Sequence, residues 1–598
     1  MKRKSNAICL LLMLVVTACA GRKEYNDGYI KYGPLEISQT DKEILLEKIR
    51  ECDPKYDPEG CMLTQVLNGW NYHTDAQSGT YHDTRASLFY AVDLFDSQEP
   101  QYEQRAIDIV DKVISVQDTD PNSPSCGVWP YFEEEPLATK KTPIDYNWAD
   151  FNAVCLLDIY MEHQDRLPAE LQEKMKNALI LAARSVQKRD CEPGYTNIAI
   201  MGTYVTYMVS HLFDLPEMKK YANERLYTFY QYTQEQKGFT EYNSPTYTIV
   251  ALDELNRMQR HIVEPEAKRM IDELYEMGWE MIARHYHKPS GQWVGPNSRS
   301  YSTLTDASFY DILKKASDGK IDLGCGKPRA DVKSTHHIPE HLLPYFLEPE
   351  YPRTEIDVFE YNEPQIKGYT YLTDEYVLST ASRSSMWNQR RPLTAYWGTV
   401  DWPHYLQVRF LHDFFDFSTV YMHTQQQQNK VVTVMDFGTD GGDKHITIGR
   451  IEEGKFKASD LRLRFELGNC RETCIQLPSC DNDAFTLEVE GVQIAIQLLE
   501  ARFGSWKGHW EQGKDEKNAW IDYVIYAGEE KDFDLTKIDQ AVYALALSVG
   551  SKVDEVAIKD TKSILSEGML QVSWGRLSVE VPVKPTEKPI KSVSQWFY

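Results

Sequence analysis

The stretch GFTEYNSPTY, from Gly238 to Tyr247, decides how the N-terminal part of this chain folds. Ser244 is a good N-cap residue, and Pro245 suits the first position of a helix. The segment that follows, TYTIVALDELNRM, keeps its apolar residues on one helical face. We therefore expect three polar and aromatic side chains at an exposed rim, in the loop that leads into this helix: Glu241, Tyr242 and Asn243.

Loops that place an aromatic residue next to or near an asparagine recur about 50 residues apart, the length of two helices with their connections. Their asparagines are Asn147, Asn197, Asn243 and Asn297. This spacing predicts stacked helical hairpins whose loops converge. One such loop alone is explained by helix capping, because glycine and asparagine suit turns and tyrosines pack. Four of them favour a sugar-binding site, which needs flat apolar faces beside amide groups.

Apolar residues recur at helical spacing from about residue 40 to 315, with proline and glycine between the segments. The predicted helices are near 41–51, 84–97, 102–117, 148–163, 168–188, 197–213, 216–236, 245–261, 264–287 and 303–315. Their number predicts an (α/α) toroid of helical hairpins over residues 41–315. Residues 316–364 are rich in glycine, proline and charge, which indicates a linker or a covering loop.

Short β-branched runs separated by turn signals replace the helical period after about residue 365. The runs are YVLSTAS, KVVTVMDF, HITIGRI, LRLRFELG, FTLEVEG, VQIAIQLLEA, AWIDYVIYAG, YALALSVG and LQVSWGRLSVEVPV. They predict an antiparallel β-sandwich over residues 365–598, so the fold class is multidomain α and β. The polar stretch SRSSMWNQRRPL near its start is either a solvated strand edge or a loop that reaches across the toroid mouth. Its notable residues are Arg383, Trp387, Asn388, Arg390 and Arg391.

The first residues have the pattern of a bacterial lipoprotein signal. A basic end is followed by an apolar run that is too short to span a membrane, and Val16 to Cys19 resembles a lipobox. We predict a signal peptide over residues 1–18, lipidation of Cys19 and a tether over residues 19–40. The expected location is the bacterial cell envelope, either the periplasm or the cell surface, with the lipid as the only membrane contact.

The composition of the chain limits the classes of molecule that it is expected to bind. The 598-residue chain carries a formal net charge of −25, which argues against a nucleic-acid partner. An anionic substrate therefore needs a local cluster of arginine, histidine and amide groups. The length favours two domains. The 37 tyrosines and 13 tryptophans suit both sugar recognition and large packed helical domains.

The cysteines indicate neither a metal site nor a catalytic thiol. Of 11 cysteines, Cys9 belongs to the signal and Cys19 to the lipid site, so an odd number remains and a complete disulfide framework is excluded. The candidate pairs are Cys52 with Cys61, or two of Cys470, Cys474 and Cys480. No HExxH, EF-hand or tetrahedral cysteine spacing occurs in the sequence, and we expect no metal and no cofactor.

A lipoprotein with a helical toroid followed by a β-sandwich resembles the polysaccharide lyases and related uronic-acid-active enzymes of gut Bacteroidetes. The resemblance covers nearly the whole mature chain and implies an acidic polysaccharide or oligosaccharide as substrate. The segment EYNSPTY departs from the paired-asparagine motif of alginate and heparin lyases. Two kinds of enzyme are most similar: a lyase that removes rhamnose caps from glucuronate, as in arabinogalactan, and an exo-β-glucuronidase with a helical toroid.

Lyase chemistry assigns roles to several of the loop residues. β-Elimination removes the C5 proton of a uronate, so its carboxylate and the developing enolate-like charge must be stabilised. Asn243, Asn297 and Arg299 suit that role, and Asn147 and Asn197 complete the predicted substrate-binding set. Tyr301, Tyr247 and His82 are the candidate acids or bases.

Two other functions stay open. Hydrolysis requires two carboxyl groups flanking the glycosidic bond, with Glu241 as the acid and Asp83 or Asp150 as its partner. A glycan-binding lipoprotein without catalysis would use the same aromatic and amide side chains. Each residue also has an ordinary structural explanation: His82 and Asp83 at a helix start, Asp150 beside a helix dipole, and Tyr247 in the core.

Replacing Cys19 with serine is expected to abolish acylation and release the protein from membranes, because the acidic chain carries no other predicted anchor. Membrane fractionation measures this outcome. A variant that still sediments with membranes would contradict the lipobox assignment.

Overall fold

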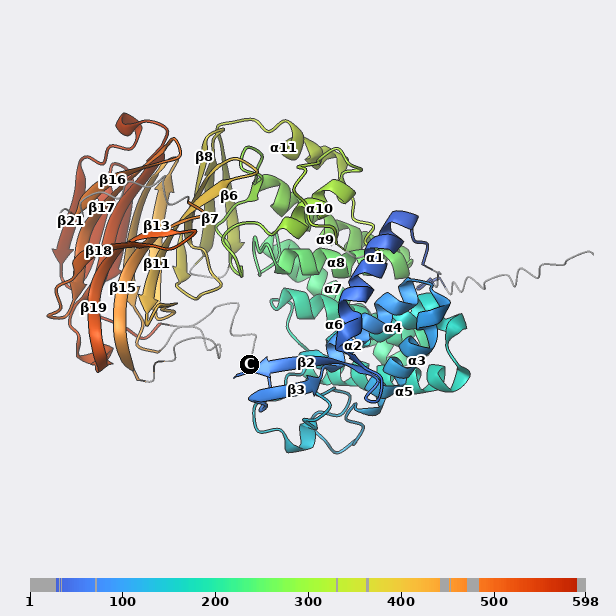
Figure 1. The fold of residues 1–598 in the computed structure, drawn as a ribbon. Helices are drawn as coiled ribbons and strands as arrows, with labels where there is room; N and C mark the ends of the chain where they lie inside the picture. The colour runs from blue at the N-terminus through green and yellow to red at the C-terminus, as the bar shows by residue number, and fades with distance from the viewer. Residues whose placement is uncertain are drawn as a thin grey trace, which may run out of the picture.

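The computed structural model describes residues 28–31, 33, 35–69, 73–329, 332–361, 365–440, 451, 453–470 and 483–588. A helical domain is followed by a layered β domain that covers one end of it (Figure 1). The predicted fold class, a helical toroid followed by an antiparallel β-sandwich, is confirmed. The signal segment and Cys19 lie outside the described residues. Within those residues, no helix has both the length and the apolarity needed to cross a membrane.

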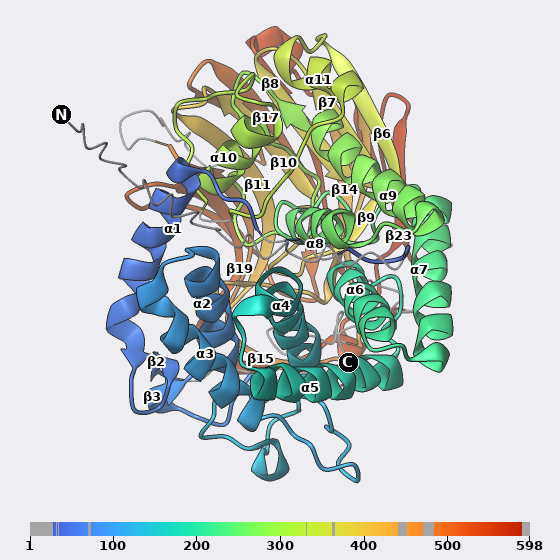
Figure 2. The same cartoon turned by 90° about the vertical axis from the view of Figure 1, so that its right-hand side faces the viewer.

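Four helical hairpins build the toroid, and Figure 2 looks into their ring. The inner helices are α2 (Thr84–Asp96), α4 (Asn147–His163), α6 (Thr196–Leu212) and α8 (Tyr247–His261). The outer helices are α3 (Pro100–Ser115), α5 (Ala169–Arg189), α7 (Pro216–Gln236) and α9 (Pro265–Arg284). Helices α4 and α6 are buried along nearly their whole length, as expected for the inner wall, whereas the outer helices bury one face.

Two further segments close the ring between α2 and α8. Helix α1 (Gln39–Cys52) is joined to α2 by Lys48, whose Nζ lies 2.8 Å from Asp93. Helix α10 (Ala307–Ala316) leads into a covering segment that ends in α11 (Leu343–Leu347). Arg329 of that segment lies 3.1 Å from Asp253 of α8.

All ten predicted helices are present, with ends shifted by at most a few residues. Helix α8 begins at Tyr247 rather than Pro245, and its N-cap residue is Thr246 rather than Ser244. The Ser244 hydroxyl still accepts the Tyr247 N–H at 3.0 Å. A small antiparallel sheet before α2 was not predicted. It comprises β1 (Tyr56–Asp57), β2 (Met62–Asn68) and β3 (Ser78–His82).

The β domain has three layers rather than the two of a simple sandwich. The nine-stranded sheet contains β6 (Arg353–Glu360), β7 (Ile366–Leu372), β8 (Tyr376–Ala381), β10 (Leu393–Gly398), β11 (Pro403–His412), β12 (Phe415–Asp416), β15 (Lys455–Gly468), β18 (His509–Lys514) and β19 (Ala519–Asp534). The six-stranded sheet contains β9 (Arg383–Ser385), β13 (Val420–Gln427), β14 (Lys430–Phe437), β16 (Ala484–Val489), β17 (Val492–Phe503) and β20 (Ala541–Gly550). The third layer contains β21 (Thr561–Ser566), β22 (Met569–Trp574) and β23 (Leu577–Pro582).

Alternating side chains set the two faces of the nine-stranded sheet. Leu406, Val408 and Phe410 of β11 enter the core between the two large sheets. Gln407 points the other way, and its Oε1 accepts a hydrogen bond of 2.8 Å from Thr303 of the helical domain. The nine-stranded sheet is therefore the layer that faces the toroid.

Several strands differ from the prediction. Strand β6 lies inside the range 316–364 that was predicted to be a linker or covering loop, and β7, β10, β11 and β13 were not predicted. The predicted run HITIGRI lies mostly outside the described residues. Cys52 and Cys61 are free thiols, so this candidate pair does not form a disulfide, and Cys474 and Cys480 are outside the described residues.

An ion-pair cluster joins the two domains at α9 and β6. Arg284 binds Glu355 at 2.9 Å and Asp357 at 2.5 Å, and His285 lies 3.2 Å from Asp357. Burial raises the pKa of Asp357, but His285 and Arg284 more than offset this and leave it below its usual range. The ionised carboxylate is thus held by the helical domain.

Replacing Arg284 with alanine is expected to lower the free energy of unfolding by about 3 kcal/mol, because it removes a charged partner from buried Asp357 and from partly buried Glu355. Urea unfolding followed by circular dichroism measures this change. Lys174→Ala, which removes an exposed pair with Asp111, is the control and should cost less than about 1 kcal/mol. Equal effects of the two variants would contradict a stabilising role for the interdomain cluster.

Candidate active site

Three loops meet where the toroid touches the β domain: residues 238–246, 294–306 and 386–392. The Ser298 N–H donates to the Tyr242 carbonyl at 3.2 Å. On the other side, the Arg391 N–H donates to the Asn297 backbone carbonyl at 3.0 Å, and the Ser300 N–H donates to the Gln389 backbone carbonyl at 2.6 Å. Residues 386–392 of the polar stretch are thus a loop that reaches the toroid, which was one of its two predicted roles, whereas Arg383–Ser385 form the edge strand β9.

Arg299 occupies the centre of this junction. Its three guanidinium nitrogens donate to Glu241 Oε1 at 2.7 Å, the Tyr247 hydroxyl at 2.8 Å and Gln389 Oε1 at 2.8 Å. The guanidinium carbon lies 3.9 Å from the centre of the Tyr247 ring and 5.4 Å from that of Trp387. Arg299 therefore joins both domains through charge, hydrogen bonds and aromatic stacking.

Glu241 lies beneath the rim rather than on it, with only 1% of its surface exposed. Its second oxygen, Oε2, accepts the Asn197 backbone N–H at 3.2 Å. Burial raises the pKa of Glu241, while Arg299 and the Asn197 amide act in the opposite direction. Both oxygens of the carboxyl group are thus engaged in holding the loop and the arginine. The prediction of an exposed loop is wrong because residues 294–301 and 386–392 cover it.

Two tyrosines extend the series of hydrogen bonds from Arg299 to solvent. The hydroxyls of Tyr247 and Tyr301 lie 2.7 Å apart, and 64% of Tyr301 is exposed. Burial raises the pKa of Tyr247, and the charge of Arg299 opposes that shift. A continuous series of hydrogen bonds thus runs from buried Glu241 through Arg299 and Tyr247 to a surface hydroxyl.

Two of the predicted substrate-binding asparagines have structural roles. The Asn243 amide nitrogen donates to the Val294 and Pro296 carbonyls at 2.8 and 2.9 Å, and its oxygen accepts the Trp293 indole N–H at 2.5 Å. Its φ of 42° is one that asparagine tolerates. The Asn297 amide donates to the Asn243 carbonyl at 2.7 Å. Both side chains are buried and hold the loops together.

Asn147 and Asn197 lie at the starts of neighbouring inner helices. The Asn147 amide contacts the Tyr195 hydroxyl at 3.4 Å and accepts from Arg189 at 2.5 Å. The Asn197 oxygen accepts the Ile198 N–H at 2.8 Å. Because the Asn197 backbone also binds Glu241, the starts of α4, α6 and the loop before α8 converge at one end of the toroid. Sugar binding by these two residues stays a prediction.

His82 belongs to a separate cluster on β3. Its ring nitrogens lie 2.6 Å from Glu134 and 3.0 Å from Asp57. Among the described residues, no hydrogen bond or ion pair joins His82 to Arg299 or to the tyrosine pair. Its proposed acid or base role is therefore not supported by the geometry, because both nitrogens are already held by carboxylates.

The predicted partners of Glu241 are also placed elsewhere. Asp83 caps α2 by accepting the Ala86 N–H at 2.8 Å. Asp150 is buried 3.9 Å from Arg189, and burial raises its pKa to about 7. In the part of the chain that the structure describes, neither carboxyl group shares a hydrogen bond or ion pair with Glu241.

Acids and histidines gather at the opposite ends of the inner helices. Two groups have potential ligand atoms within 4.8 Å of one another: Asp96, Glu162 and His163, and Asp158, Glu162 and His261. Lys333 enters this region, with its Nζ 2.7 Å from Glu162 and 3.1 Å from Asp96. The nearby acids raise the pKa of Lys333. A protonated lysine therefore supplies the positive charge that these carboxylates require.

Gln389 is the site residue that the sequence did not single out. It lies within the polar stretch SRSSMWNQRRPL, which was noted for its arginines and tryptophan. The available signal was the density of polar groups beside Trp387, but nothing local indicated that Gln389 would bind an arginine 90 residues earlier in the chain.

Residues 43–314 match the model of a family described as a domain of unknown function, DUF8769. A comparison with curated proteins found no match. Among solved structures, the chain is similar to heparinase III, with 10% identity, a TM-score of 0.45, and coverage of 92% of this chain and 91% of that one.

Two other solved structures show the same level of similarity. Chondroitin AC lyase of Streptomyces coelicolor, solved with chondroitin sulphate, has 9% identity and a TM-score of 0.45, with 89% and 83% of the two chains covered. A heparan sulfate lyase mutant from Pedobacter heparinus has 9% identity and a TM-score of 0.40, with 92% and 90% covered. Similarity at this level assigns no residue role to the present chain.

Replacing Asn243 with alanine is expected to lower the free energy of unfolding by about 3 kcal/mol, because two buried carbonyls and an indole N–H lose their partner. Urea unfolding measures the change. Asn197→Ala is the control and should cost less than about 1 kcal/mol, since its side chain accepts only the adjacent amide. Wild-type stability in Asn243→Ala would contradict the structural role.

Proposed function

We propose that this protein is a polysaccharide lyase that cleaves beside a uronate by β-elimination. The observation that carries the proposal is the series Glu241, Arg299, Tyr247 and Tyr301, which ends in an exposed hydroxyl where the two domains meet. Fixed cationic and hydrogen-bonding groups beside a reacting tyrosine are what enolate formation requires.

The reaction can be assigned to these groups step by step. The Tyr301 oxygen removes the C5 proton, and the electrons of that bond form the C4–C5 double bond as the C4–O4 bond breaks. The departing O4 receives the proton from the Tyr301 hydroxyl. Tyr247 donates a hydrogen bond to Tyr301 while it is deprotonated, and Arg299 stabilises the negative charge of the pair.

Glu241 has a positioning role in this mechanism. It holds the arginine with one oxygen and the start of α6 with the other. A general acid in a hydrolase would need a proton to donate and a second carboxyl group across the bond. Both of its oxygens are already engaged, by Arg299 and by the Asn197 amide, and among the described residues no second carboxyl group is bonded to it, so the arrangement favours a lyase over the alternative exo-β-glucuronidase.

The finer parts of the proposal follow from the sequence resemblance. We infer glucuronate as the uronate, with removal of rhamnose caps from arabinogalactan as the candidate reaction. The lipid anchor at Cys19 would hold the enzyme at the cell envelope beside its polysaccharide. Non-catalytic glycan binding is the outcome that remains if no product forms.

Turnover of a glucuronate-containing glycan is expected to raise ultraviolet absorbance, because the unsaturated product conjugates a double bond with its carboxylate. Tyr301→Phe and Arg299→Ala should each lower the rate by about a hundredfold or more, since one removes the proton carrier and the other its stabilising charge. Glu241→Gln should be milder. Tyr227→Phe, at an exposed tyrosine of the outer helix α7, is the matched control and should leave the rate unchanged.

The opposite pattern would identify a hydrolase. Released sugar without an absorbance change, lost in Glu241→Gln but retained in Tyr301→Phe, contradicts the lyase proposal. Binding of the glycan with no product of either kind would assign the protein to the non-catalytic class.

A further inference from the structure

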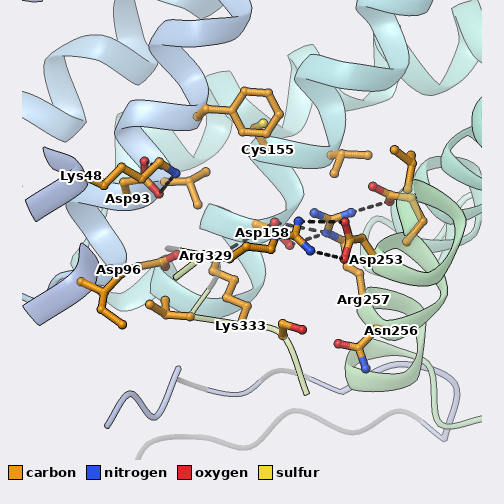
Figure 3. Close-up of a pocket in the computed structure, with 18 of the residues that line it drawn as sticks. Lys48, Asp93, Asp96, Cys155, Asp158, Asp253, Asn256, Arg257, Arg329 and Lys333 are labelled. Atoms are coloured by element: carbon orange, nitrogen blue, oxygen red, sulfur yellow. Dashed lines mark hydrogen bonds and ion pairs between the residues drawn. The ribbon is translucent and has the colours of Figure 1, made fainter. Parts of the chain in front are cut away.

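A cavity of about 720 Å³ lies inside the bore of the toroid (Figure 3). Helices α1, α2, α4, α6 and α8 and the covering segment line it. Arg85, Phe151 and Val250 line it within the first turns of their helices, so the cavity begins close to the ring of helix starts described above. Its volume is in the range of pockets that hold small ligands.

Most of the cations that line this cavity are paired with acids, as Figure 3 shows for several of them. The pairs are Lys48 with Asp93, Arg257 with Asp158, Arg260 with Glu162, Arg329 with Asp253, and Lys333 with Glu162. Such pairing is the usual condition for a charge inside a protein. Lys327 is exposed to solvent and needs no partner.

Arg85 does not follow this rule. No hydrogen bond or ion pair to its guanidinium occurs among the described residues, and its Nε is buried without a partner. The guanidinium carbon instead lies 3.7 Å from the centre of the Phe151 ring and 5.3 Å from that of Phe89. Burial lowers the pKa of Arg85. The charges of Asp83 and Asp145 oppose this shift from a distance, but neither forms a hydrogen bond or ion pair with the guanidinium.

The nearest acids are engaged elsewhere. Asp83 accepts the Ala86 N–H as the cap of α2, and Asp145 lies 3.2 Å from His73. Phe89 contributes an apolar ring to the same place, with 44% of its surface exposed although it lines the cavity. A planar cation beside an accessible aromatic ring suits an anionic sugar, whose carboxylate pairs with arginine and whose ring packs on the aromatic face.

We propose that Arg85 binds the carboxylate of a uronic acid unit inside the bore, with the sugar ring against Phe89. The inference rests on the proposed function only in taking the ligand to be an acidic saccharide. A local cation is needed there, because the chain as a whole carries a net charge of −25 and repels anions. Arg85 is thus a substrate-binding residue separate from the Arg299 and tyrosine series.

Binding of free glucuronic acid to the full chain tests this proposal by titration calorimetry, with glucose as the uncharged counterpart and inorganic sulfate as the bare anion. We expect Arg85→Met to weaken glucuronic acid binding by about tenfold or more, and Arg85→Lys by less, because lysine keeps the charge but not the planar fork. Lys327→Met, which removes an exposed cation from the same cavity, is the matched control and should change binding by less than about twofold.

Several results would overturn the proposal. They are wild-type affinity in Arg85→Met, equal affinity for glucose and glucuronic acid, and Arg85-dependent binding of sulfate that is as tight as that of the sugar acid. The thermal midpoint of Arg85→Met should equal or exceed that of the wild type, because a partly buried charge without a hydrogen-bonded partner is removed. A fall of more than about 5 °C would assign Arg85 to packing instead.

This test is independent of turnover. Free glucuronic acid has no glycosidic bond to cleave, so its binding does not depend on the lyase mechanism. Arg85-dependent binding without any absorbance change in the lyase assay would reject the proposed reaction alone. Lyase activity with unaltered binding in Arg85→Met would reject the bore subsite alone.

Discussion

The buried ion pair between Glu241 and Arg299 is the contact on which the arrangement of the site depends. Removing one member of such a pair costs about 3–5 kcal/mol, because the remaining charge stays out of water. Here the pair is satisfied on every side, by Asn197 at the glutamate and by Tyr247 and Gln389 at the arginine. One guanidinium therefore fixes the start of α6, the start of α8 and the first loops of the β domain relative to one another.

The two ends of the toroid use charge in different ways. At the end that faces the β domain, the ion pair leads through two tyrosines to an exposed hydroxyl. At the far end, carboxylates near the C-terminal ends of α2 and α4 surround Lys333 of the covering segment. Negative charges near the C-terminal end of a helix are unfavourable, because the helix dipole is also negative there. The positive charge of Lys333 offsets the carboxylates and the dipoles. A tyrosine hydroxyl is therefore exposed to solvent at one end of the toroid, whereas at the other end a buried lysine pairs with the carboxylates of the inner helices.

Sequence periodicity predicted the helices well because each is set by local spacing of apolar residues. The inner and outer helices were placed to within a few residues, and the four asparagine loops do converge. Strand β10 was missed because nearly all its residues are buried, which hides the alternation that marks a half-buried strand. Strand β6 was missed because its more buried face carries the charged residues Glu355 and Asp357, whereas its apolar Ile356 is exposed. Contacts between distant segments, such as Arg299 with Gln389, had no local signal at all.

Hydrogen-bond satisfaction separates the structural polar residues from the chemically available ones. Asn243 had the right type and position for substrate binding, yet its amide nitrogen and oxygen are both used by the loop beside it. His82 is likewise held between two carboxylates. Residue type predicts what a side chain can do, but only the surrounding contacts show whether that capacity has been used.

The same criterion identifies Arg85, for which the sequence predicted only a position near the start of the helix over residues 84–97. A surface arginine without a protein partner does not indicate a binding site, because water solvates its guanidinium. A partly buried arginine that meets aromatic rings, lines a cavity and has a buried Nε without a partner retains hydrogen-bonding capacity that the protein does not use. Its neighbours in the bore show that this chain can supply an acid for a buried cation, so the missing acid at Arg85 is best explained by an anion that arrives with the ligand.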